Sequence, residues 1–60
     1  MPTYALSTPG GSALGAFELD DDEAQVGAII RREGEPDRRV LERWPSEDPE
    51  RFAVLVVERV

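Results

Sequence analysis

The sequence has 60 residues, of which 13 are acidic and seven are basic, and its net charge is −6. A chain this short forms a single domain, residues 1–60, and buries only about 60% of the surface that its unfolded form exposes. It contains no cysteine and no histidine, which excludes disulfides, thiolate metal sites and the usual general base near pH 7. We therefore expect no catalytic residue, no metal site and no cofactor, and we predict that the protein is not an enzyme.

The hydropathy of the chain bears on where the protein works. No stretch approaches the ~20 apolar residues of a membrane span, and MPTYALSTPGG at the start lacks the basic and apolar regions of a secretory signal. We expect a cytoplasmic protein with no membrane partner. Because small domains without disulfides or metals often gain stability by association, we also expect a protein partner or a homo-oligomer.

The first third of the chain has the pattern of a β-hairpin. Residues 3–8 (TYALST) alternate, with Tyr4 and Leu6 on one face, and residues 14–20 (LGAFELD) place Phe17 and Leu19 on one face. The residues between them, PGGS, are a dense turn signal. We predict two antiparallel strands joined by a loop of about four residues.

Residues 20–34 allow two interpretations. In the first, residues 22–33 form a helix with Asp22 as its cap and Gly34 at its end, although Gly27 in the middle costs about 1 kcal/mol relative to alanine. In the second, residues 20–25 are an acidic loop and residues 26–33 are a strand. We favour the strand because its apolar pair Ile29–Ile30 lies opposite Val40–Leu41 across a turn at residues 34–37.

The end of the chain carries the strongest strand signals. Residues 38–44 (RRVLERW) form the return strand of that turn, and residues 46–51 (SEDPER) are a polar connector. From Phe52 to Val57 every residue is apolar, which is typical of a strand covered on both faces. We predict an all-β fold, a small five-stranded antiparallel SH3-like barrel or bent meander. The alternative is an α+β domain, ββαββ, with the helix at 22–33.

Two features indicate a module that binds a protein, possibly as a homodimer with a regulatory role. The apolar strand offers more surface than a small sheet covers, which favours self-association, edge to edge or face to face, through residues 52–57. Five acids between Glu18 and Glu23 give −5 within six positions and would steer a basic partner, whereas the EF-hand spacing fails at Gln25 and Arg31. The expected contact residues are Glu18, Asp20, Asp21, Asp22, Glu23, Trp44, Phe52, Val54 and Val56.

The alternative function is that of a small barrel that binds nucleic acid. Five arginines fall on the expected central hairpin, and Trp44 would be a stacking platform. Acids are interleaved with these arginines and the chain is anionic as a whole, so we rank nucleic acid below protein as a partner. The arginines in question are Arg31, Arg32, Arg38, Arg39 and Arg43.

Overall fold

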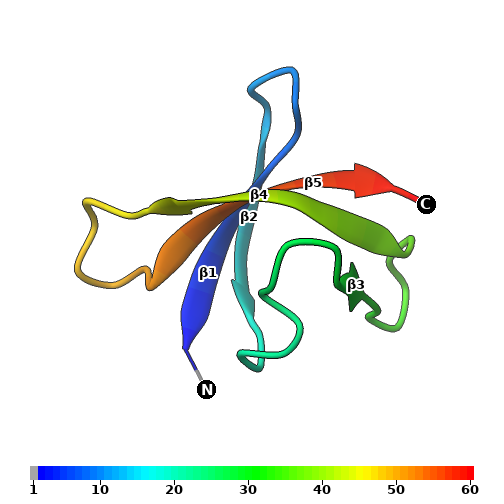
Figure 1. The fold of residues 1–60 in the computed structure, drawn as a ribbon, viewed down its shortest axis with the longest axis horizontal. Coiled ribbons are helices and arrows are strands. Elements are labelled where there is room, and N and C mark those ends of the chain that lie inside the picture. Colours follow the sequence, from blue (N-terminus) through cyan, green and yellow to red (C-terminus); the bar gives the residue numbers. More distant parts are fainter. Residues whose placement is uncertain (1) are drawn as a thin grey trace.

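In the computed structural model, which describes residues 2–60, the chain forms five strands and these residues include no helix (Figure 1). The all-β prediction is confirmed. The strands lie side by side in one curled sheet in the order β2-β1-β5-β4-β3. Their bounds are β1 Thr3–Ser7, β2 Ala13–Glu18, β3 Ile29–Ile30, β4 Arg38–Pro45 and β5 Ala53–Arg59.

The predicted hairpin is present. β1 and β2 pair antiparallel, from Thr3 opposite Glu18 to Leu6 opposite Gly15, and the register shifts next to Leu6. Gly15 has φ +108°, a conformation that side chains disfavour and that accompanies such an irregularity. The connecting loop is closed by hydrogen bonds on both sides of Thr8: its amide donates to the Ser12 carbonyl, and its own carbonyl accepts from the Gly11 amide.

One strand pairing differs from the expected antiparallel arrangement. β1 and β5 run parallel, with Leu6 opposite Leu55, so the sheet is mixed. β5 also pairs antiparallel with β4 on its other side and therefore lies at the centre of the sheet. Because neighbouring strands already occupy both edges of β5, the expected edge-to-edge association through residues 52–57 is wrong.

The segment before β4 is a series of turns with one short strand. The alternative helix at 22–33 is wrong, because Gly27 has φ +90° and its amide donates to the carbonyl of Val40 in the sheet instead of to a helical turn. The predicted strand over residues 26–33 shrinks to Ile29–Ile30, which pairs with Arg39 and Arg38. The antiparallel partner was predicted correctly, but the register with Val40–Leu41 was wrong.

The core lies on one face of the sheet, which we call the inner face. The segment between β2 and β4 covers this face. It contributes Leu19 and Ala24 from its turns and Ile30 from β3 to the core. In β5 alternate residues are buried, whereas Val54 and Val56 between them are only half-buried. The chain itself therefore buries only one face of β5, and cover of the second face by another molecule stays a prediction. The buried residues are Tyr4, Leu6, Leu19, Ala24, Ile30, Val40, Ala53, Leu55 and Val57.

We predict that the two faces of β5 differ sharply in their tolerance to truncation. Leu55 is fully buried, so Leu55→Ala should lower the free energy of unfolding by about 2–5 kcal/mol through lost burial and a cavity. Val54→Ala removes a half-buried side chain from the other face and should cost less than about 1 kcal/mol. Urea unfolding followed by circular dichroism measures both. Equal losses in the two variants would contradict the one-sided core.

Candidate protein-binding surface

The second face of the sheet, which we call the outer face, carries an apolar row across four strands. The register aligns Ala16 with Ala5, Ala5 with Val54, and Val54 with Trp44. Facing residues in adjacent strands point to the same side of a sheet, so these four side chains form one continuous line. Ala16 is exposed, Ala5 and Val54 are half-buried, and Trp44 is 55% exposed.

An irregularity in β4 places Trp44 on this face. The register with β5 shifts between Val40 and Glu42, which leaves Leu41 as an extra residue. Simple alternation from the buried Val40 would turn Glu42 toward the core and Arg43 away from it. The extra residue reverses that order, so Glu42 and Trp44 share the outer face with Val54 and Val56.

Charged residues surround the apolar row. Glu42 lies opposite Val56 on one side of the row, and Glu18 lies opposite Thr3 on the other side. Glu58 and Arg39 lie opposite each other further along β5 and β4. The outer face is thus an apolar band whose flanks carry more acidic than basic side chains.

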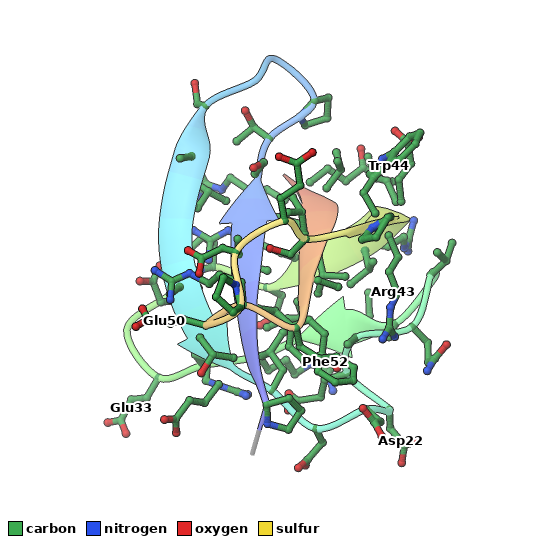
Figure 2. The ribbon with its side chains drawn as sticks, turned by 90° about the vertical axis from the view of Figure 1, so that its left-hand side faces the viewer. Asp22, Glu33, Arg43, Trp44, Glu50 and Phe52 are labelled. Atoms are coloured by element: carbon green, nitrogen blue, oxygen red, sulfur yellow. The ribbon has the colours of Figure 1, made fainter. Side chains whose placement is uncertain are left out.

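Phe52, one of the predicted contact residues, is not part of this row but lines a hollow of about 400 Å³ together with Trp44 and Arg43. Its ring meets that of Tyr4 edge to face at 5.7 Å, and the Arg43 guanidinium lies 5.5 Å from the Tyr4 ring centre and 5.9 Å from that of Phe52. In Figure 2 Arg43 lies between Trp44 above it and Phe52 below it. Phe52 is 62% exposed, but it belongs to the rim of the inner face.

The acidic cluster at 18–23 is partly occupied by contacts within the chain. Arg32 donates hydrogen bonds to both carboxylate oxygens of Glu23, at 2.7 and 2.9 Å, and to the backbone carbonyl of Glu18 at 2.9 Å. Asp21 accepts a hydrogen bond from the Tyr4 hydroxyl at 3.1 Å. Two of the five carboxylates therefore hold the turn segment in place, whereas Glu18, Asp20 and Asp22 are exposed.

These contacts shift the pKa values of Glu23 and Tyr4, and the hydrogen bonds to Glu23 raise the pKa of Arg32. The Arg32 guanidinium, mainly through its hydrogen bonds, holds the pKa of Glu23 below its usual value. Burial, reinforced by the hydrogen bond to Asp21, raises the pKa of the Tyr4 phenol. Both shifts are explained by these local contacts.

The five arginines of the nucleic-acid alternative are not brought together on one face. Arg31, Arg32 and Arg38 pair with acids on the turn segments, namely Asp37, Glu23 and Glu35 respectively. Arg43 lies on the inner face, where its Nη1 donates to the Ala24 carbonyl at 3.4 Å. Arg39 is on the outer face, opposite Glu58.

Over residues 2–60 the side chains form no group of three or more acids that is arranged to hold a metal ion. These residues also include no helix that is long and apolar enough to cross a bilayer. No protein-family model, no curated protein and no solved structure matches this chain significantly.

Sequence reasoning found part of the outer face. Trp44, Val54 and Val56 were predicted contact residues and lie on it, but Ala5 and Ala16 were missed. The alternation of residues 3–8 assigned Ala5 to the face opposite Tyr4 and Leu6, so a signal existed. What the sequence lacked was the strand order that lines these two alanines up with Val54.

We predict that the ion pair of Glu23 with Arg32 stabilises the fold at neutral pH and not in acid. A lowered pKa means that its contribution is present above the ordinary glutamate value of 4.5 and is lost as the pH falls through the folded-state value. At pH 7 Glu23→Gln should lower the free energy of unfolding by about 1–2 kcal/mol, because charge-assisted hydrogen bonds to a half-buried group are lost.

Urea unfolding at steps from pH 7 to pH 3 measures this effect. The difference between the wild type and Glu23→Gln should shrink as the pH decreases below 4.5. Glu33→Gln is the matched control, because it removes the same charge from an exposed residue (Figure 2) and should change stability by less than about 0.5 kcal/mol at every pH. If the two variants behaved alike, the structural role of Glu23 would be disproved.

Proposed function

We propose that the protein is a non-enzymatic module that binds another protein through the outer face of its sheet. The observation that carries the proposal is the apolar row formed by Ala16, Ala5, Val54 and Trp44 across four strands. A sheet is normally covered on both faces or made polar on the open one. An open apolar face of a small domain is a surface for association.

The charges around the row favour a basic partner. Glu18 and Glu42 border the row, Asp20 and Asp22 are exposed on the turn beyond β2, and the chain carries −6 overall. Such a distribution attracts a positively charged surface over about a Debye length, ~8 Å at physiological salt, and repels a negatively charged one. The partner we propose therefore has an apolar centre and basic residues around it.

A second copy of this chain fits the same face less well. Two copies would bring the acidic side chains Glu18 and Glu42 of one rim close to those of the other, and like charges repel. A homodimer through this face alone would be weak, so the basic partner is the first expectation. A regulatory role and a cytoplasmic location belong to the same proposal.

Cross-linking from defined positions tests the proposal. A photoreactive phenylalanine analogue at position 16 lies in the row, and one at Glu33 lies on an exposed turn outside it. In cells that express the protein, position 16 should give an adduct with a basic protein and position 33 should not. Val54→Glu, which adds a carboxylate to the centre of the row, should remove the adduct while circular dichroism shows an intact fold.

The decisive measurement uses the purified protein and the purified partner that cross-linking identifies. Their dissociation constant should rise at least tenfold with Val54→Glu and should also rise with salt, because rim charges contribute to the contact. Equal adducts from positions 16 and 33, or none from position 16, would contradict the proposal. An adduct with a second copy alone would replace the basic partner by a homodimer.

A further inference from the structure

A groove of about 320 Å³ opens at the end of the inner face that lies far from Phe52. The hairpin loop after β1 forms one wall, and the paired ends of β4 and β5 form the other. Its volume lies at the lower end of the range of small-molecule sites, about 300–1,000 Å³. The lining residues are Thr8, Pro9, Leu14, Arg38, Val57, Glu58 and Arg59.

The deeper part of the groove is apolar and preformed. Val57 is buried, and Leu14 packs against the core from β2. The loop that carries Pro9 is held by three hydrogen bonds at Thr8, because the Ser12 amide also donates to the Thr8 hydroxyl oxygen at 3.1 Å. An apolar ligand therefore meets a surface whose shape is already set, which reduces the entropic cost of binding.

Two arginines lie directly opposite each other at the mouth. Arg38 of β4 faces Arg59 of β5 in the register, next to the buried pair of Val40 and Val57 on the same face. Like charges in opposing positions of a sheet are unfavourable. The next pair along the two strands, Arg39 opposite Glu58, is the usual combination of opposite charges. The like-charged pair thus lies on the inner face, and Glu58, which also lines the groove, already has Arg39 opposite it.

The chain neutralises this pair only in part. Arg38 donates one hydrogen bond to Glu35 Oε2 at 3.2 Å, and its side chain is only 13% exposed. Among the residues that the structure describes, Arg59 forms no ion pair. Guanidinium groups have five N–H donors and match a carboxylate with two parallel hydrogen bonds. An anion between Arg38 and Arg59 would relieve their repulsion.

We infer that this groove binds a fatty carboxylate, with the acyl chain on Leu14, Pro9 and Val57 and the carboxylate between Arg38 and Arg59. The apolar floor selects the chain and the two guanidinium groups select the anionic head, although the molecule as a whole is acidic. The inference is independent of the proposed function, because the groove lies at the Val57–Arg59 end of β5, whereas the apolar row crosses β5 at Val54. No covalent step is involved.

The test uses octanoate as the probe, with the shifts of backbone amide signals in ¹⁵N–¹H NMR spectra as the readout. Octanoate should give saturable shifts at Leu14, Val57 and Arg59. Hexanoate and then butanoate should bind progressively more weakly, by up to about 15-fold for each two methylene groups removed. Octyltrimethylammonium, which has the same chain and the opposite charge, should bind at least tenfold more weakly than octanoate.

Two arginine variants separate a site from a general charge effect. Arg59→Gln should weaken octanoate binding at least fivefold, because one of the two cationic partners is lost. Arg39→Gln makes the same charge change one residue from Arg38 but on the outer face, and it should change binding less than twofold. Both residues are exposed, so both variants should keep the wild-type spectrum elsewhere.

Three results would overturn the inference. They are the absence of saturable shifts with octanoate, equal binding of octanoate and octyltrimethylammonium, and equal weakening by Arg39→Gln and Arg59→Gln. None of these results bears on the outer face, so failure here and failure of the proposed protein contact are distinguishable.

Discussion

The parallel pairing of β1 with β5 is the constraint on which the rest of the sheet depends. It joins the two ends of the chain and places Leu6 beside Leu55, both of them fully buried. Parallel strands cannot be joined by a tight turn, so the intervening chain must leave the pair and return. Here that connection contains β2, β3 and β4, which makes each of them either an outer strand or a neighbour of β5. Because the pairing is non-local, we expect it to form late in folding.

The sequence predicted strands where alternation was strong, and failed where the outcome depended on strands distant in the chain. Residues 3–8 were found because their apolar residues repeat with the period of a strand, and residues 38–44 were found as the return strand of the turn at residues 34–37. The strand order could not be predicted, because several different strands could pair with β5 and its apolar residues would be buried equally well in each case. β3 is shorter than predicted because Gly27, with φ +90°, interrupts the extended backbone on one side, and a turn closed by the Glu35 amide and the Arg32 carbonyl ends it on the other.

The candidate site shows the same limit. A run of apolar residues indicated that β5 needs cover, yet it could not show that Val54 and Val56 face away from the core while Phe52 joins the inner rim. The acidic cluster at 18–23 was predicted to be a free recognition surface, because a sequence shows the number of charges but not which of them form ion pairs within the fold. Arg32, which lies outside the cluster, donates hydrogen bonds to the Glu23 carboxylate and to the Glu18 carbonyl. Part of that charge therefore serves the fold.

The extra residue in β4 explains how one strand serves two different surfaces. Before Leu41 the inner side of β4 carries Arg38 and Val40, and after it the inner side carries Arg43, which contacts the Tyr4 ring. Without the extra residue, Glu42 would point into the core unpaired, at a cost of several kcal/mol, and Trp44 would follow it. The irregularity thus keeps a carboxylate out of the core and brings the indole to the outer face. The extra residue Leu41 reverses which residues of β4 face the core. It thereby places Glu42 on the outer face while Arg38 stays on the inner face at the groove. The hydropathy of the sequence does not reveal this reversal.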